Sequence, residues 1–349
     1  MSEVKPYTAL ALQTTCHAIN RVADVAAARS KMLDNIARVG RQIHAAKAFI
    51  GPDVRLVVLP EYFASSYPLG DALPVWAARA AWAPNGPEYA AMGEVAVAAA
   101  VFVSGNVYET DEHFPGLYFQ TSFIVDDGGA VVLRYRRLVS MFAPTPHDVW
   151  DRYLQVCGLD AVFPVADTVL GRLACIASEE ILYPEIARAL ALKGAELLLH
   201  STSEVGSPRL TPKDVAKRAR AHENMAWVVS ANSAGIVGTD FPAQSTDGMS
   251  KVVDFKGEVR AEAGFGESMV AHHEIDIAAV RRARAKPGMA NVLARQRLEL
   301  FAPMYGGSVY PANSMLGASG QLQVPERTHF MATQLRAIQA LRDRGVIAQ

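Results

Sequence analysis

The stretch Gly171-Arg-Leu-Ala-Cys-Ile-Ala-Ser-Glu-Glu-Ile-Leu-Tyr-Pro-Glu185 decides the fold, because it reads as a strand, a sharp turn and a helix. Residues 173–177 form the short apolar run of a strand that is buried on both faces. Pro184 suits a first helical position, and Glu185 follows where the helix dipole favours negative charge. The apolar run at 197–199 begins another strand after Gly194 ends the helix. This order predicts an α/β protein.

Ser178 stands where the strand gives way to the helix. Enzymes with α/β folds place nucleophiles at such a turn, because the side chain projects from the carboxyl edge of the sheet and nearby N–H groups stabilise an oxyanion. An ordinary turn or cap serine also fits this position. The stretch by itself leaves both interpretations open.

Composition narrows the class of protein. The 349 residues are 50% hydrophobic, enough for a large core, and 34 Lys+Arg against 35 Asp+Glu give a net charge of −1. Without a long basic run, neither nucleic acid nor an anionic membrane is an expected partner, whereas a small-molecule substrate is. The three cysteines, Cys16, Cys157 and Cys175, are too far apart for a metal or disulfide motif, which indicates a reducing compartment. We expect no metal and no cofactor.

The termini and the hydropathy pattern indicate where the chain resides. The first twelve residues lack the basic and apolar regions of a signal peptide. The longest apolar stretch, residues 95–103, is too short to span a bilayer. We therefore expect a cytoplasmic protein.

Alternating strand and helix patterns extend along the chain to about residue 280. Strands are predicted at 7–13, 56–59, 101–107, 119–125, 130–135, 173–177 and 227–231, with helices at 24–48, 88–99 and from 184, and a last hairpin within 248–275. The hairpin at 119–135 makes the sheet mixed. We predict one domain over residues 1–280 and an extension over 281–349, with a final helix at about 327–345, that packs on the domain or on a partner subunit.

Polar residues follow several of the predicted strands. Glu61 comes directly after a buried strand, Arg137 ends the second strand of the hairpin, and Ser203 lies in the polar loop at 200–204. Residues 139–151 are predicted to be a loop that carries Asp148 and Trp150. Each of these positions suits either a solvated rim or the wall of a pocket.

Taken together, these segments resemble the nitrilase, or carbon–nitrogen hydrolase, superfamily over roughly residues 7–280. Leu59-Pro60-Glu61 is similar to its glutamate motif, Tyr135-Arg136-Arg137-Leu138 to its lysine motif, and residues 171–185 to its cysteine motif. The resemblance implies a four-layer α-β-β-α sandwich, here with a C-terminal tail, that pairs into homodimers or larger homo-oligomers. It also implies a glutamate base, a lysine that stabilises the oxyanion, and a cysteine that forms a thioester with an amide or nitrile carbon.

The chain departs from this pattern at two of the three positions. Ser178 falls on the nucleophile and Arg137 on the lysine, while Glu61 is retained. A serine hydroxyl is a far weaker acid than a thiol, and an arginine cannot donate a proton as a lysine can. Cys175 lies three residues earlier and would point to the opposite face of its strand, so we interpret it as a buried structural residue. The auxiliary glutamate of many members has no clear counterpart, and Asp148 is the nearest acidic residue.

These observations support three hypotheses. The first is an enzyme that acts on a small amide, nitrile or related C–N substrate through Glu61, Arg137 and Ser178. The residues expected to contact substrate are Asp148, Trp150, Glu179, Glu180 and Ser203, although Glu180 could instead pair with Arg136 or Arg137. The second is a catalytically inactive protein that binds small molecules on the same scaffold. The third, a laboratory replacement of cysteine by Ser178, would leave Arg137 unexplained.

Overall fold

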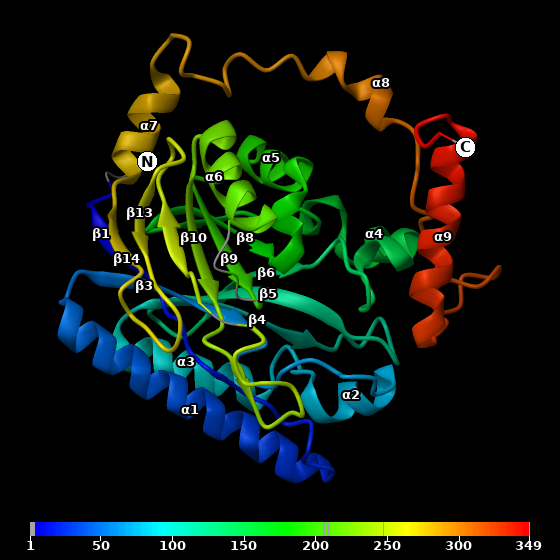
Figure 1. The fold of residues 1–349 in the computed structure, drawn as a ribbon, viewed down its shortest axis with the longest axis horizontal. Helices are drawn as coiled ribbons and strands as arrows, with labels where there is room; N and C mark the ends of the chain where they lie inside the picture. The colour runs from blue at the N-terminus through cyan, green and yellow to red at the C-terminus, as the bar shows by residue number, and fades with distance from the viewer. Residues whose placement is uncertain (1–3, 205–206, 208–209, 247, 349) are drawn as a thin grey trace.

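A computed structural model of the chain describes residues 4–204, 207, 210–246 and 248–348. Two six-stranded mixed sheets pack face to face between two layers of helices (Figure 1). The first sheet has the order β14 (His272–Ile275), β1 (Tyr7–Ala11), β3 (Val54–Glu61), β4 (Phe102–Glu109), β5 (Phe119–Val125) and β6 (Val131–Arg136). The second has the order β13 (Val259–Glu262), β12 (Lys251–Val253), β10 (Trp227–Asn232), β9 (Leu197–Thr202), β8 (Gly171–Ala177) and β7 (Ala166–Thr168). The predicted four-layer sandwich is confirmed.

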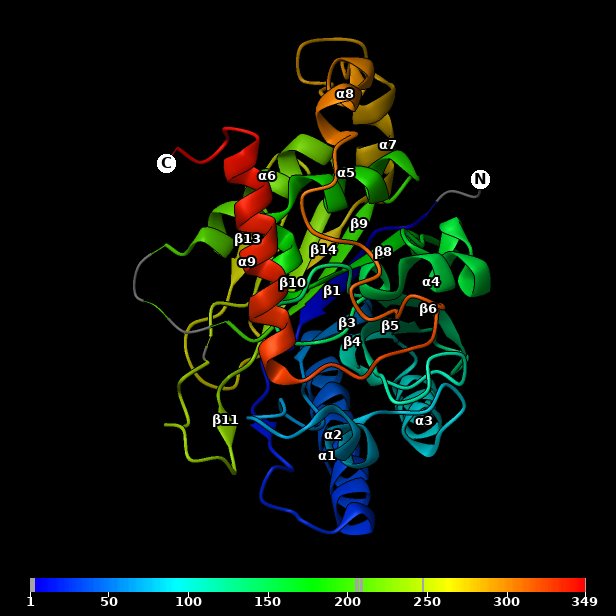
Figure 2. The same cartoon turned by 90° about the vertical axis from the view of Figure 1, so that its right-hand side faces the viewer.

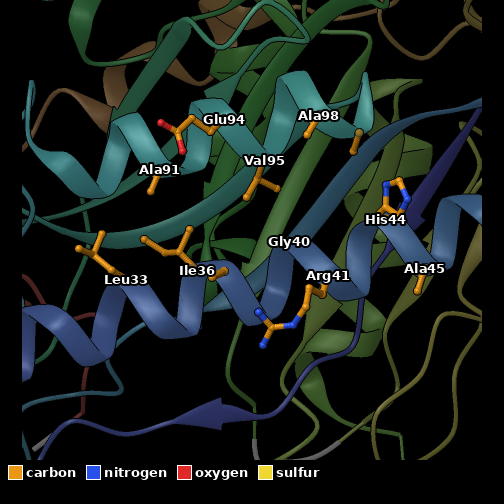
Figure 3. Close-up of a pocket in the computed structure, with 12 residues that line it drawn as sticks. Leu33, Ile36, Gly40, Arg41, His44, Ala45, Ala91, Glu94, Val95 and Ala98 are labelled. Atoms are coloured by element: carbon orange, nitrogen blue, oxygen red, sulfur yellow. The ribbon is translucent and has the colours of Figure 1, made fainter.

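The helices α1 (Val25–Ile50), α2 (Leu73–Ala80) and α3 (Pro87–Ala99) cover the first sheet. Asp24 caps α1 by accepting a hydrogen bond from the backbone N–H of Ala27 at 2.8 Å. Gly40 permits close contact with α3, since a Cβ atom there would lie 2.7 Å from Val95 Cγ2. A largely apolar surface groove lies between these two helices, with Ile36 and Val95 among its lining residues (Figure 3).

The helices α5 (Pro184–Leu192) and α6 (Pro212–Asn224) cover the second sheet (Figure 1). The core between the two sheets contains apolar side chains from both, among them Leu56, Val58, Ala174 and Ile176, which are fully buried. In the second sheet β8, β9 and β10 run parallel, so their carboxyl ends lie at one edge, and the end of β3 from the first sheet meets that edge where the Ser203 N–H donates to Glu61. This edge carries the polar residues discussed below.

Two local predictions were wrong, and one helix was missed. In the last hairpin, predicted within 248–275, the strand that pairs with β12 is β13, whereas the strand at 272–275 pairs antiparallel with β1 of the first sheet. The helix α2 was not predicted. The segment at 139–151 is not entirely loop, because it contains a short 3-10 helix, Pro146–Val149, followed at once by α4 (Trp150–Cys157).

The C-terminal extension carries α8 (Ala302–Tyr305) and α9 (Arg327–Asp343), after α7 (Ile277–Ala285) has crossed the end of the sandwich. It runs past α5 and α6 and returns along one side of the molecule, where α9 lies (Figures 1 and 2). Met315 and Phe330 pack there against Phe114, Val149 and Tyr153. Within the part of the chain that the structure describes, no helix is both long and apolar enough to cross a membrane.

Candidate active site

Ser178 occupies a strained turn at the end of β8. Its φ of +50° lies in the left-handed region, which is uncommon for a residue with a side chain and recurs at functional sites. It begins a 3-10 helix, Ser178–Leu182, and 6% of its surface is exposed. The predicted strand-to-helix turn is confirmed.

His200, at the fourth position of β9, holds this turn. Its Nε2 lies 2.8 Å from the backbone oxygen of Ser178, and its Nδ1 lies 2.8 Å from Ser230 Oγ. Because a carbonyl only accepts hydrogen bonds, Nε2 carries the proton and Nδ1 accepts from the Ser230 hydroxyl. Complete burial, together with the charge of nearby Lys217, lowers the pKa of His200 well below its usual value. A neutral imidazole therefore fixes the backbone of the turn.

Glu61 ends β3 and is 2% exposed. Its Oε1 accepts from the Gln120 side-chain amide and from Arg137 Nη1, the latter at 3.4 Å, and its Oε2 accepts from the Ser203 backbone N–H at 3.1 Å. Gln120 Oε1 in turn accepts from Arg137 Nη1 at 2.6 Å. Ser203 therefore contacts Glu61 through its backbone N–H. The sequence pointed to this residue but did not predict that its backbone makes the contact.

Arg137 lies beside Glu61 and is 6% exposed. Besides Gln120 and Glu61, its guanidinium donates to the Val139 carbonyl oxygen at 2.7 Å and to the Glu179 carboxylate. Burial opposes the charge, but Glu61 and other neighbouring acidic groups raise the pKa of Arg137 further above its usual value. The cation is thus held by four acceptors of this chain.

Glu180 does not pair with an arginine, contrary to one of the alternatives that the sequence left open. Its carboxylate accepts from the Tyr135 hydroxyl at 2.8 Å and from the backbone N–H groups of Leu138, Val139 and Ala177 at 2.6, 3.1 and 3.2 Å. Burial raises the pKa of Glu180 to about 7 although these donors favour its charged form. Glu180 joins β6 to the turn at Ser178, and Glu179 is the neighbour that contacts Arg137.

Asp148 and Trp150 lie on the short helices that replace the predicted loop. Asp148 caps the first of these, with its carboxylate accepting from Thr145 N at 2.9 Å and from Ser314 Oγ at 2.6 Å. Among the described residues, no hydrogen bond joins Asp148 or Trp150 to Ser178. Their contact with substrate stays a prediction.

The sequence analysis missed Lys213, in the first turn of α6. Its Nζ lies 3.4 Å from Ser178 Oγ and 3.1 Å from Thr202 Oγ1. Burial lowers the pKa of Lys213, opposed by the charge of Glu61. This edge of the sandwich thus brings together a hydroxyl, an amine, a carboxylate and a guanidinium, a set of groups suited to acyl transfer.

Cys175 lies in β8, three residues before Ser178, and is completely buried in the sandwich core, as expected. Burial raises the pKa of its thiol to about 12, so the thiol is a poor nucleophile. In the described ranges, no three His, Cys, Asp or Glu side chains gather in an arrangement that could hold a metal ion.

Comparison with known proteins gives a consistent result. The family model for carbon-nitrogen hydrolases matches residues 11–285. A formamidase of Pseudomonas syringae pv. syringae is 28% identical over 258 residues, covering 74% of this chain and 70% of that protein. Among solved structures, a carbon-nitrogen hydrolase from Helicobacter pylori G27 (TM-score 0.65, 20% identity, 86% of this chain and 98% of that one) shares the fold. Nit3 of Saccharomyces cerevisiae also shares the fold, with a TM-score of 0.63 and 21% identity over 81% of this chain and 96% of that one. The chain belongs to the carbon–nitrogen hydrolase family.

Proposed function

We propose that this protein hydrolyses the C–N bond of small amides, with Ser178 as the nucleophile. The observation that carries the proposal is the turn itself, where a positive φ and the bond to His200 present the Ser178 hydroxyl beside Lys213. Glu61 and Arg137 are the other two members of the site, as a carboxylate and a cation joined through Gln120. The formamidase relatives favour amides over nitriles as the substrate class.

The size of the substrate follows from burial. Ser178, Glu61 and Arg137 are all buried, so a short acyl group reaches the hydroxyl more readily than a bulky one. We expect Glu179 to border the entrance, since a third of its side-chain surface is exposed beside Arg137.

Ammonia release from formamide, acetamide, propionamide and matching nitriles tests the proposal. We expect turnover of the short amides, its loss in Ser178→Ala, and a strong decrease in Glu61→Gln. Intact-mass spectrometry during turnover should reveal an acyl group on the wild-type chain and none on Ser178→Ala. Absence of turnover, or turnover that survives both substitutions, would contradict it.

A second candidate is a binding protein without hydrolytic activity. It is favoured by Arg137, whose donors are engaged by Gln120, Glu61, Glu179 and Val139 and so are not directed at an oxyanion. A small amide that binds, by calorimetry, and is recovered intact would support this candidate. An acyl adduct on Ser178 would exclude it.

We also propose that a second copy of the chain covers α5, α6 and the extension. Apolar side chains are exposed on these elements, among them Leu192 (53%), Val215 (52%) and Met304 (78%). The described part of the extension, from residue 281 to residue 348, runs past the same two helices (Figure 1). Light scattering should give at least twice the 37.6 kDa chain mass, and Val215→Glu should lower it. A monomeric wild type would contradict this arrangement.

A further inference from the structure

We propose that Lys213 is the general base and acid of the reaction, so that Ser178 and Lys213 act as a serine–lysine pair. The inference rests on the proposed function and specifies which group moves the proton. Ser178 lies in the segment that resembles the cysteine motif, whereas Lys213 lies outside all three motifs from which the resemblance was argued.

Geometry places the amine at the nucleophile. Lys213 Nζ lies 3.4 Å from Ser178 Oγ, at the outer limit of a hydrogen bond, and such contacts are often longer before substrate binds. The helix that carries Lys213 is attached to the turn, because Arg220 Nε donates to the Ile181 carbonyl oxygen at 3.0 Å and Nη2 donates to that of Leu182 at 3.3 Å. The distance is therefore set by packing on both sides.

The partners of Lys213 distinguish it from its neighbours. Lys217, one turn later, contacts the carboxylates of Glu204 at 3.2 Å and Asp214 at 3.4 Å. Lys251 contacts Asp214 at 2.8 Å, and also Glu262. Within the described residues, no carboxylate oxygen lies within 4 Å of Lys213 Nζ, and its hydrogen-bond partners are the hydroxyls of Ser178 and Thr202. Hydroxyl groups accommodate a neutral amine, whereas carboxylates would hold it charged.

The surrounding charges favour an amine that loses its proton readily. Burial is the main effect that lowers the pKa of Lys213, and the positive end of α6 acts in the same direction. The charged and titratable groups that face it from the neighbouring elements are Glu61 of β3, Arg137 after β6, His200 of β9, Glu204 after β9 and Lys217 of α6. Lys217 and Arg137 reinforce the lowering, while Glu61 and Glu204 oppose it.

The other candidate bases are engaged elsewhere. His200 donates to the backbone oxygen of Ser178 rather than contacting Oγ. The two oxygens of Glu61 accept from Gln120, Arg137 and Ser203. Arginine does not lose its proton in proteins, so Arg137 cannot serve as a base.

The pair accounts for every proton of the hydrolysis. The neutral amine of Lys213 takes the Ser178 hydroxyl proton while Oγ bonds to the amide carbon and the carbonyl electron pair moves to its oxygen. The tetrahedral species then expels the nitrogen, which takes that proton from the Lys213 ammonium and leaves as ammonia, with an ester on Ser178. Water adds to the ester as Lys213 accepts its proton, and the C–Oγ bond breaks as the proton returns to Oγ.

Two variants of Lys213 test the role, each measured in two reactions. The first reaction is amide turnover, and the second is acylation of Ser178 by p-nitrophenyl acetate, followed by intact-mass spectrometry. Lys213→Met removes the amine, and Lys213→Arg keeps the charge without a usable base. We expect both to lose about 10²–10⁴-fold in each reaction. Lys193→Met, the same change at a surface lysine whose side chain is 43% exposed, should match wild type.

A chemical rescue separates proton transfer from a structural role. Lys213→Cys, alkylated with bromoethylamine, regains an amine of nearly the same reach but weaker basicity, while identically treated wild type serves as the control. We expect recovered acylation with the acid limb of its pH–rate profile shifted to lower pH. An unchanged acid limb, or wild-type rates in Lys213→Arg, would overturn the inference.

The two reactions also separate this inference from the proposed function. Lys213-dependent acylation of Ser178 in a protein that hydrolyses no amide would uphold the pair and refute the amidase activity. Amide turnover that is unaffected by either Lys213 substitution would uphold the activity and refute the pair.

Discussion

Arg137→Lys would introduce the residue type that the resemblance implies at this position, yet we expect it to destabilise this protein. The guanidinium reaches acceptors in several directions, with Nε bonded to the Val139 carbonyl and Nη2 to Glu179. A lysine has one nitrogen, which can stay near Glu61 and Gln120 but cannot also reach the other two acceptors.

The magnitude follows from what each lost contact leaves behind. An unpaired carbonyl at Val139 costs about 1–3 kcal/mol. The Glu179 contact is worth about 1 kcal/mol, because a third of that side chain is exposed and water screens it. We expect Arg137→Lys to lower the free energy of unfolding by about 2–4 kcal/mol. Arg137→Met should cost about 3–5 kcal/mol, because Glu61 would then be a buried charge without its cation.

Urea unfolding followed by tryptophan fluorescence measures both changes, with the m-value checked for constancy. Arg282→Lys is the matched control, since its side chain is 70% exposed and contacts Asp276 at the surface, and it should change the free energy by less than about 0.5 kcal/mol. Two results would refute the conclusion that four acceptors hold the Arg137 guanidinium. One is an Arg137→Lys variant as stable as the Arg282→Lys control, and the other is an Arg137→Lys variant less stable than Arg137→Met.

Three further predictions concern the turn. Iodoacetamide at neutral pH should add one label to Ser178→Cys and none to wild type, as measured by intact mass. The reason is that burial raises the pKa of the native thiols, to about 12 for Cys16 and Cys175, and so keeps them unreactive. Labelling of wild type would contradict this prediction. Burial raises the pKa of Glu180 from 4.5 to about 7, so the folded state keeps this proton to a higher pH than the unfolded state does. As the pH rises from 4.5 to 7.5, the free energy of unfolding of wild type should therefore fall by up to about 3 kcal/mol relative to that of Glu180→Gln. Curves of stability against pH that run parallel for the two proteins would contradict this prediction. His200→Phe removes the bond to the Ser178 carbonyl and should lower kcat about 10–100-fold with a smaller change in KM; an unchanged kcat would show that the bond is dispensable.

The positions of Glu61 and Ser178 could be predicted because each follows an uninterrupted apolar run. Such runs form strands buried on both faces, and parallel strands end at one edge of a sheet, so residues directly after them converge. The side-chain partners could not be predicted in this way. Gln120 meets Arg137 only because of the register of the β5–β6 hairpin, where the Arg137 N–H donates to the Gln120 carbonyl oxygen at 2.8 Å.

The cap formed by Asp148 and the position of Lys213 could both have been predicted from one pattern. The segments Thr145-Pro-His-Asp148 and Thr211-Pro-Lys-Asp214 both follow the pattern Thr-Pro-x-Asp, and both form a capping box with proline in the first turn. This pattern marks a helix start, with the aspartate turned back to its own backbone. From this pattern Asp148 can be predicted to cap a helix. The same pattern predicts that α6 begins at Pro212, so that Lys213 lies in its first turn, beyond the carboxyl end of β9.

The proposed serine–lysine pair gives one chemical reason for Ser178 and Arg137, which stand where the resemblance implies a cysteine and a lysine. A thiol with a pKa of about 8.5 becomes a nucleophile beside a fixed cation, whereas an alcohol needs a group that takes its proton as the bond forms. An arginine at position 137 stabilises Glu61 and Glu179 but cannot take a proton. In the proposed mechanism, a serine nucleophile at position 178 needs a titratable base from another element, and α6 brings Lys213 to the same edge. The amine of Lys213 contacts the hydroxyls of Ser178 and Thr202, so the proposed pair would keep the chemistry of acyl transfer with a serine in place of the cysteine that the resemblance implies.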